Sequence, residues 1–515
     1  MSTFISPLAI TPNILHQLYQ GVIKHLVAWV LASYGIAEID AHCRHLPPNH
    51  NIRLFMKGIS SLSRVTGREH DQMAHILLGL VLDARLPDGI SSVRLVRSIR
   101  AILDFLFLSQ YPLHTSDTLK LLDDALNRFH ESKAIFVDLG IREHFNLPKV
   151  HFMRHFVTSI KAFGTLDNFN TEYTERLHID FAKDAYRATN RKDEFRQMTI
   201  WLERREKILR HDQHISWHLS GSPPPKTVDW SPPGLDLHRR LHITKHPSAM
   251  SVPLENIVHD YGATLFKLAL RRYISLCNNL TRTFRTGQEL DESLWNVRLP
   301  FVRLPVWHRV KFLQTDAFTG VTSTVDSIHV APARRDRRNR YVPPRFDTAL
   351  LLNDEVEAGH SSNSDLDEQQ DHHGIQGLIL SSTLWVTRTV DLKHPAAYRV
   401  GRIHVIFSLP ENARERVITP EIDVPDHLAY VEWFTPFRDA PEPNSLLYKV
   451  SPMRDDTGGP ICSIVPLSDI LRSVQLFPRF GQVAPAAWTS SNVLNECDSF
   501  LVNSFTDRHL YRLLI

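Results

Sequence analysis

The residues best suited to chemistry lie between Asn170 and Asn190, in the run NTEYTERLHIDFAKDAYRATN. Asn170 can cap a helix by accepting a backbone N–H, and Glu172 then falls in the first turn, where the helix dipole favours negative charge. Glu172, Glu175 and Arg176 share one helix face, because residues three and four apart are neighbours. A carboxylate presented in this way could bind a metal ion. The same spacing also describes an amphipathic surface helix with internal ion pairs, and spacing alone does not separate the two.

Helices are predicted to position this run. Residues 14–34 carry apolar side chains at helical spacing, and the preceding Asn13 supplies capping chemistry. Further apolar helical faces continue to residue 160, interrupted by the turn-forming runs LPDG and YP. We therefore predict that residues 1–215 form a mostly α-helical region.

Two other sets of residues in this region have spacings that suit binding. Arg94, Arg97 and Arg100 recur every three residues, so they could follow a phosphate backbone or form the solvated face of an amphipathic helix. His151 and His155 are four residues apart and could share a metal ion, but no third ligand lies in view.

The character of the sequence changes after residue 215. The runs SPPP and SPPG cannot continue a helix and suit a semi-rigid linker. Residues 359–374 are acidic and polar, as in a disordered segment, and residues 378–395 have the character of an insertion. The predicted units are residues 1–215, helical; 216–253, a Pro-rich linker; 254–345, a short helix with an extended basic segment; 346–396, disordered or inserted; and 397–515, β-rich.

The most basic run of the chain is RRDRRNR. It could bind nucleic acid or serve as a nuclear import signal, and as an exposed loop it could equally provide solubility alone. Its arginines are Arg334, Arg335, Arg337, Arg338 and Arg340.

The last unit carries five short runs typical of strands, which suggest a small β-barrel or sandwich. Tyr430, Trp433 and Phe434 could line a peptide pocket, although aromatic residues on a strand more often belong to a core. The five runs are residues 400–409, 428–434, 446–450, 461–467 and 499–505.

Composition limits the class of protein. The 515 residues suffice for roughly two to four domains. A net charge of +3 means that any DNA-binding surface must be local. The four cysteines form no CxxC pair, which argues against a zinc finger or a disulfide framework. We expect a soluble intracellular protein, nuclear or cytoplasmic, without a signal peptide or a membrane span.

The run from Phe163 to Trp201, including FGTLDNFNTEYTERLHID and DAYRATNRKDEF, closely resembles Plavaka-type transposases of fungi, relatives of the CACTA-like DNA transposons. The runs GISSLSRVTGREHDQM, SQYPLHTSDTLKLL and GRIHVIFSLP resemble the same family. The resemblance implies an RNase H-like core in which two aspartates and a helical glutamate hold Mg²⁺ ions for phosphodiester chemistry. It makes Glu175 the candidate third carboxylate, with Glu172 the alternative, and it implies an SH3- or BAH-like C-terminal module.

The chain departs from this family at its catalytic positions. The stretch PNILHQLYQG matches a family run that begins Pro-Asp, so Asn13 stands where the second aspartate is expected. An amide oxygen is neutral and ligates Mg²⁺ weakly, whereas Asn13 has a structural role of its own as a helix N-cap. The family's upstream region, with the first aspartate, has no counterpart before Asn13. Glu175 and Glu172 are therefore expected to be vestigial, with no cofactor bound.

These observations predict an α+β protein. The N-terminal half is expected to be mostly helical, the remnant of an RNase H-like core with an all-α insertion, followed by a linker and a small β-barrel-like domain. The predicted function is that of a truncated, catalytically inactive transposase derivative that retains DNA binding. The alternative is a protein-interaction module, a helical domain plus a β-barrel, with a protein partner and no nucleic-acid role.

Overall fold

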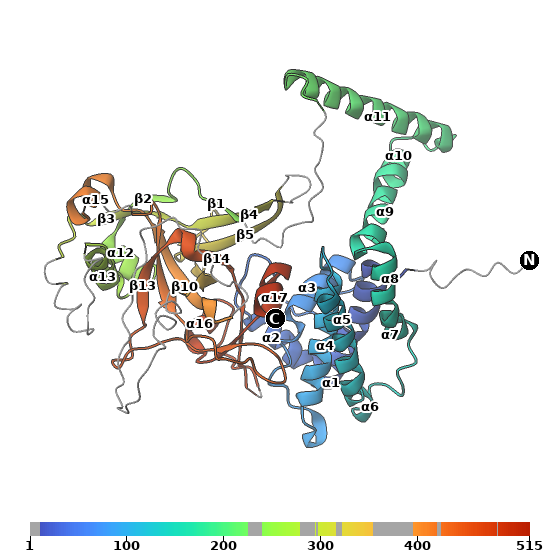
Figure 1. Ribbon diagram of the computed structural model, residues 1–515, viewed down its shortest axis with the longest axis horizontal. Helices are drawn as coiled ribbons and strands as arrows, with labels where there is room; N and C mark the ends of the chain where they lie inside the picture. The colour runs from blue at the N-terminus through green and yellow to red at the C-terminus, as the bar shows by residue number, and fades with distance from the viewer. Residues whose placement is uncertain are drawn as a thin grey trace, which may run out of the picture.

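The computed structural model places a bundle of helices beside a set of antiparallel sheets (Figure 1). It describes residues 11–224, 239–278, 294, 297–315, 322–353, 395–419, 424–481 and 483–515. Every regular element within residues 11–224 is helical, and the first described strand begins at residue 239. The predicted α+β class is therefore confirmed, whereas an RNase H-like core is not, since residues 11–224 contain no strand.

Local sequence explains how the helices of the first half begin and pack. They are η2 (Ile14–Ile23), α1 (Lys24–Tyr34), α2 (Ile36–His45), α3 (Gly67–Leu77), α4 (Val93–Ser109), α5 (Ser116–Ser132), α6 (Ile135–Asp138), α7 (Pro148–Phe152), α8 (Phe156–Phe163), α9 (Thr171–His178), η6 (Ile179–Lys183), α10 (Asp184–Arg187) and α11 (Glu194–Leu219). Thr66 and Thr115 start α3 and α5 with capping boxes. Residues 98–109 of α4 are all buried, so α4 is the central helix of the bundle.

The second half contains the sheets and a few short helices. The strands are β1 (Arg239–His242), β2 (Ala249–Pro253), β3 (Arg303–Trp307), β4 (Arg309–Thr315), β5 (Thr322–Ala331), β6 (Arg334–Arg335), β7 (Tyr341–Val342), β8 (Arg345–Phe346), β9 (Thr348–Leu352), β10 (Tyr398–Phe407), β11 (Leu428–Trp433), β12 (Lys449–Val450), β13 (Cys462–Pro466), β14 (Ile470–Ser473), β15 (Leu476–Pro478) and β16 (Phe500–Val502). The helices are α12 (Leu254–His259), α13 (Phe266–Asn278), α15 (Glu411–Val417), α16 (Val493–Glu496) and α17 (Arg508–Leu514).

Three predicted features lie wholly or largely outside the described residues. They are the acidic stretch 359–374, residues 378–394 of the predicted insertion, and residues 225–238 of the predicted linker.

β10 is the central strand of the largest sheet, and all ten of its residues are buried. It pairs antiparallel with β11, β9 and β3. β3 falls in the predicted unit 254–345, β9 in the unit 346–396, and β10 and β11 in the unit 397–515, so this sheet joins three units that the sequence had separated. Each of the five predicted strand runs contains an observed strand, but the pairings between described strands do not close a ring. The predicted barrel is therefore not confirmed.

The helical half and the C-terminal residues share one hydrophobic core. Gly79 follows α3 and allows the Phe477 ring to approach the helix, since a Cβ at position 79 would lie 2.3 Å from that ring. The C-terminal residues that are buried with the helices include Leu447, Phe477, Phe480, Leu501, Phe505 and Tyr511.

A buried ion pair on α4 fixes this junction. Arg100 Nε donates to Asp104 Oδ1 at 2.7 Å, one helical turn away. The Nη1 atom of Arg100 also donates to the Ser445 carbonyl at 2.7 Å. Asp104 accepts from the Tyr511 hydroxyl at 2.9 Å and from Arg128 at 2.8 Å. Both buried charges thus have several partners, drawn from the two halves, which is the condition under which a buried pair offsets its desolvation penalty.

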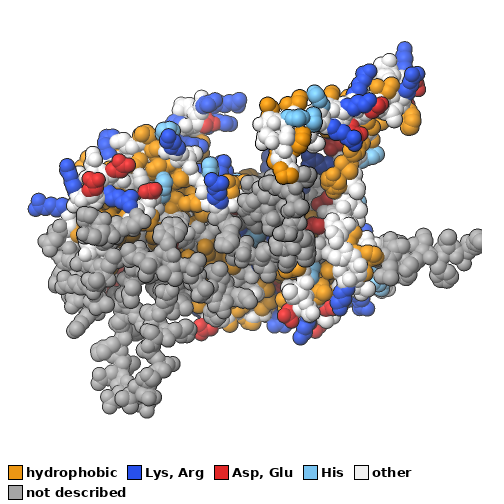
Figure 2. Space-filling view, turned by 45° about the horizontal axis from the view of Figure 1, so that its top comes forward, with side chains coloured by type: hydrophobic (Ala, Val, Ile, Leu, Met, Phe, Trp, Pro, Cys, Tyr) orange, Lys and Arg blue, Asp and Glu red, His pale blue; other side chains and the backbone are white. Residues whose placement is uncertain are grey.

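Residues 171–219, comprising α9, η6, α10 and α11, form an arm that leaves the bundle beyond α8 (Figure 1). Ala185 is the only buried residue of the arm. The N-terminal half of α11 packs against α10, and its Arg205 donates to the Asp180 carbonyl of η6 at 3.3 Å. Figure 2 shows hydrophobic, basic and histidine side chains exposed along the arm.

No single helix among the described residues is long and apolar enough to cross a membrane. The bent pair of Ile14–Tyr34 and Ile36–His45 passes the test of length and composition only when its two helices are taken together, and they meet at 108°. Apolar side chains of both helices belong to the buried core.

Arg100→Ala is expected to lower the free energy of unfolding by about 3–5 kcal/mol, because Asp104 then remains buried without its main partner. Arg97→Ala is the matched control, since exposed Arg97 makes a single bond to Asn444 Oδ1 at 3.1 Å, and a change within about 0.5 kcal/mol is expected. Urea unfolding followed by circular dichroism measures both. Equal stability of the two variants would contradict this account of the junction.

Candidate functional site

Asn13 and Glu175, the two positions that the family resemblance assigned to metal binding, meet around His16. Asn13 Oδ1 accepts a hydrogen bond from the backbone N–H of His16 at 2.7 Å, so Asn13 is the N-cap of η2. Nε2 of His16 contacts Oε1 of Glu175 on α9. The predicted capping role of Asn13 is confirmed. His16 contacts both residues, Asn13 through its backbone N–H and Glu175 through its imidazole.

Lys149 of α7 holds η2 in place. Its Nζ donates to the His16 carbonyl at 3.1 Å, and its own carbonyl accepts from the Gln17 side chain. Gly21 leaves room for the Lys149 side chain, because a Cβ at position 21 would lie 3.0 Å from Lys149 Cδ. Residues 14–34 are helical as predicted, beginning as the π-helix η2 and continuing as the α-helix α1. Such wider turns are frequent at functional sites.

These residues do not fit a two-metal site. Mg²⁺ prefers charged oxygen ligands, but Asn13 is neutral and its side-chain oxygen serves the helix cap. Oε1 of Glu175 contacts His16 and accepts from the Thr171 hydroxyl at 3.4 Å. Within the described part of the chain, no group of three or more His, Cys, Asp or Glu residues could hold a metal ion.

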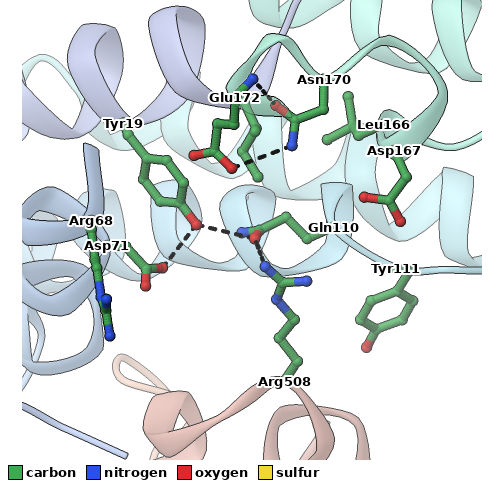
Figure 3. Close-up of a pocket in the computed structure, with 11 residues that line it drawn as sticks. Tyr19, Arg68, Asp71, Gln110, Tyr111, Leu166, Asp167, Asn170, Glu172 and Arg508 are labelled. Carbon is green, nitrogen blue, oxygen red and sulfur yellow. Dashed lines mark hydrogen bonds between the residues drawn. The ribbon is translucent and has the colours of Figure 1, made fainter. Parts of the chain in front are cut away.

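Glu172 lies one turn before Glu175 and lines a cavity of about 270 Å³ (Figure 3). The Tyr19 hydroxyl donates to Asp71 Oδ1 at 2.8 Å and lies 3.1 Å from Gln110 Oε1. Arg508 of α17 donates to the same Gln110 oxygen. The cavity is lined by Ile14, Tyr19, Arg68, Asp71, Gln110, Tyr111, Leu166, Asp167, Asn170, Glu172 and Arg508.

Charges of both signs line this cavity. Asp71, Asp167 and Glu172 contribute carboxylates, and Arg68 and Arg508 contribute guanidinium groups. Such a lining suits small polar molecules and selects neither anions nor cations. It therefore does not indicate a phosphate-binding pocket.

Asp71, which lines the cavity, forms an ion pair with buried His75, with His75 Nε2 3.7 Å from Asp71 Oδ2. Burial acts to lower the pKa of His75, but the negative charge of Asp71 and the hydrogen bond to the Phe505 carbonyl outweigh it, and the pKa is raised. Burial acts to raise the pKa of Asp71, but the charge of His75 and the hydrogen bond from the Tyr19 hydroxyl outweigh it, and the pKa is lowered. Both shifts favour the charged pair.

The sequence did not indicate this cavity. Tyr19, Asp71 and Gln110 lie within predicted helices, where polar residues on partly apolar faces are common. Arg508 lies in the C-terminal helix, and it is separated from Gln110 by 398 residues of sequence. The only sequence signal for this cavity is the motif GREHDQM, which contains Asp71 and belongs to the family resemblance.

The row of Arg94, Arg97 and Arg100 does not form one phosphate-binding face. Arg94 pairs with Asp138 at 2.6 Å and Arg97 donates to Asn444. Arg100 is buried, because its guanidinium holds the junction between the two halves. Arg100 therefore belongs neither to a row of phosphate contacts nor to a solvated face, the two alternatives that the sequence left open, while Arg94 and Arg97 are exposed.

The arginine run 334–340 forms an exposed hairpin, which we call the arginine hairpin. β6 and β7 pair antiparallel, with Arg334 opposite Val342. Asp336 closes the turn by accepting from the backbone N–H of Arg338 at 2.8 Å and from the Arg340 side chain at 2.8 Å. Asn339 adopts a left-handed φ of 58°, which asparagine tolerates better than most residues. All five arginines of the run are exposed.

The remaining candidate residues, the aromatic residues near β11 and the two histidines, contact neighbouring side chains within the fold. Tyr430 and Phe434 are buried, which confirms their predicted place in a core. Trp433 donates from Nε1 to Ser463 Oγ at 2.8 Å, and the Arg399 guanidinium lies 4.8 Å from its ring centroid. The rings of His151 and His155 lie edge to face, 5.2 Å apart.

Comparisons with protein-family models, with curated proteins and with solved structures returned no match. The resemblance to Plavaka-type transposases therefore rests on the sequence runs quoted above and stays a prediction.

Asn13→Ala is expected to lower the free energy of unfolding by about 1 kcal/mol, because the cap of η2 is lost. Asn13→Asp keeps the capping oxygen and should match the unaltered chain. Thermal unfolding of the three proteins measures the difference. An Asn13→Asp variant as unstable as Asn13→Ala would contradict the capping role.

The His75–Asp71 pair predicts a pH-dependent stability. Because the pKa of His75 is raised in the folded state, its contribution is complete below the unfolded value of about 6.5 and is lost as pH rises through the folded pKa. The lowered pKa of Asp71 makes its contribution complete above about 3.9 and lost as pH falls through its folded pKa. His75→Gln should therefore destabilise the protein more at pH 6 than at pH 9.

Urea unfolding across this range, with exposed His178→Gln as the control, measures the effect. A His75→Gln penalty that does not change with pH would contradict the charged pair.

Proposed function

We propose that this chain is a transposase-derived protein that binds duplex DNA through the arginine hairpin and does not cleave it. The family part of the proposal rests on the sequence runs that resemble Plavaka-type transposases. On this account, the helical half is the remnant of an RNase H-like core with its all-α insertion. A DNA-binding role implies a nuclear location.

The arginine hairpin is the observation that supports DNA binding best. Within seven residues it presents five arginines, and its single acid, Asp336, is used in the turn. Tyr341 beside them is 66% exposed, so an aromatic ring accompanies the cations. The major groove of B-DNA admits a two-stranded β-ribbon, and arginines on such a ribbon can reach phosphates on either side.

On this proposal, the loss of DNA cleavage follows from the chemistry of Asn13 and Glu175, the two positions that the family resemblance assigned to metal binding. Two-metal catalysis requires several carboxylates around the ions, to neutralise them and to position water or a 3′-OH. Asn13 contributes no charge, and the Glu175 carboxylate contacts His16. Binding to DNA should therefore be independent of Mg²⁺.

The second candidate is a protein-interaction module. The C-terminal aromatic residues give it little support, since Tyr430 and Phe434 are buried. The exposed apolar side chains of the arm favour it instead. The two functions are compatible, because the arm and the arginine hairpin are separate surfaces.

Changing Arg334, Arg337 and Arg338 together to glutamine should weaken binding to duplex DNA and reduce the slope of log affinity against log salt by about 3, one for each lost phosphate contact. Replacing these three side chains should leave the Asp336 turn intact, because the side chain that bonds to Asp336 is that of Arg340. Fluorescence anisotropy across a salt series measures the slope.

The matched control removes three exposed cations from the arm, as Lys192→Gln, Arg196→Gln and Arg204→Gln, and should leave the slope nearly unchanged. An equal loss in both variants would show that binding follows net charge alone. Mg²⁺-dependent nicking of DNA by the unaltered chain would contradict the inactive part of the proposal.

A further inference from the structure

Two strands of the four-stranded sheet present basic side chains on one face. The sheet has the order β1–β4–β5–β8, and β1, β4 and β5 lie side by side in Figure 1. Side chains alternate between the two faces along a strand, and residues that pair across antiparallel strands share a face. Lys311 of β4 pairs with His242 of β1. Two residues further along β4, Leu313 pairs with Arg240. One face, which we call the basic sheet face, therefore carries Arg240, His242, Arg309 and Lys311.

The basic sheet face is the outer face of this sheet. Arg240, His242 and Arg309 are exposed, and Lys311 is half-buried. The alternate residues of β4 point the other way, because Val310 and Phe312 are buried in the hydrophobic core of the second half. The basic side chains therefore face solvent while the opposite face holds the fold together.

Two acidic residues lie on or beside these strands, and both are buried. Asp326 of β5 is 3% exposed and accepts from the Ser473 hydroxyl at 2.6 Å. Asp347, just after β8, is 2% exposed and accepts from Arg345 Nε at 2.7 Å. Since Asp326 is the only acid within β1, β4, β5 and β8, the strands themselves place no exposed carboxylate beside the cations.

The arginine hairpin adjoins this face. β5 ends at Ala331 and β6 begins at Arg334, so two residues separate the sheet from the arginine hairpin. His308 lies immediately before Arg309 in the chain. Burial lowers the pKa of His308, and the positive charge of Arg334 lowers it further, which places the base of the hairpin near the Arg309 end of β4.

Duplex DNA fits this surface better than a single strand does. Single strands are held largely by bases that stack on aromatic side chains. The outward positions of β1, β4 and β5 that the structure describes carry no Phe, Tyr or Trp. Basic side chains contact phosphates instead, and such contacts position a duplex without reading its sequence.

We propose that the basic sheet face binds the phosphate backbone of the same duplex that the arginine hairpin contacts. This inference rests on the proposed function and adds to it a second contact surface, which orients the DNA. Because phosphates are alike in every sequence, losing this surface should weaken binding to unrelated duplexes by the same factor.

The double variant Arg240→Gln with Lys311→Gln should reduce the slope of log affinity against log salt by about 2, one for each lost phosphate contact. Fluorescence anisotropy with the full chain and two unrelated duplexes measures the slope and the uniform loss. Both side chains lie on the outer face, so the sheet should remain folded, which circular dichroism checks. Arg240→Lys with Lys311→Arg keeps both charges and should keep the slope.

The matched control, Arg271→Gln with Arg416→Gln, removes two exposed cations from α13 and α15, which lie apart from β4 and β5 in Figure 1. It should leave the slope unchanged. An equal loss in the control would overturn the inference. So would an unchanged slope in the Arg240–Lys311 variant while the arginine hairpin variant loses its share, and that result would leave the proposed function standing.

An unaltered chain that does not bind duplex DNA at low salt would overturn both the inference and the proposed function. Vesicles containing phosphatidylserine test a lipid surface as the other polyanionic partner. If the Arg240–Lys311 variant lost binding to these vesicles but kept its DNA slope, the partner of the basic sheet face would be a membrane, and the inference would be wrong.

Discussion

The buried carboxylate of Asp104 receives hydrogen bonds from Arg100, Arg128 and Tyr511, so that residues from both ends of the chain depend on one charge. Arg100 carries this link further, because its guanidinium also donates to carbonyls at residues 445 and 446. A buried charge that loses a partner is costly, whereas one that keeps all of them holds its surroundings in a single arrangement. The helical half and the C-terminal residues are therefore positioned by one satisfied polar network within a shared apolar core.

That junction leaves two surfaces outside the core with different chemical character. The arginine hairpin is a short β-ribbon whose only acidic residue, Asp336, accepts hydrogen bonds within the turn. Its positive charge suits a polyanion. The arm carries exposed apolar side chains among charges of both signs, which suits a protein partner. Asn13 and Glu175, the two positions that the family resemblance assigned to metal binding, take part instead in a helix cap and in a contact with His16.

Local features were predictable from the sequence, and features that depend on distant contacts were not. The Asn13 cap, the helical spacing in the first half and the buried Tyr430 depend on neighbouring residues, so their patterns are visible in the sequence. Arg100 sits in a regular row of arginines, and nothing nearby shows that it reaches residue 445. The same limit applies to the sheet that joins β3 and β9 to β10, and to the cavity that Arg508 completes from the C-terminal helix. The arginine run was visible, but its hairpin geometry depends on the pairing of β6 with β7.

Hydrogen exchange of the backbone amides, measured with and without duplex DNA, tests the central claim most directly. The account predicts slower exchange in residues 334–342 when DNA is bound, since contact with DNA would shield the hairpin from solvent. Residues 13–16 and 171–178 should exchange at the same rate in both states. Protection centred on Asn13 and Glu175, with an unprotected hairpin, would instead mean that DNA binds at the positions that the family resemblance assigned to catalysis and would contradict the account.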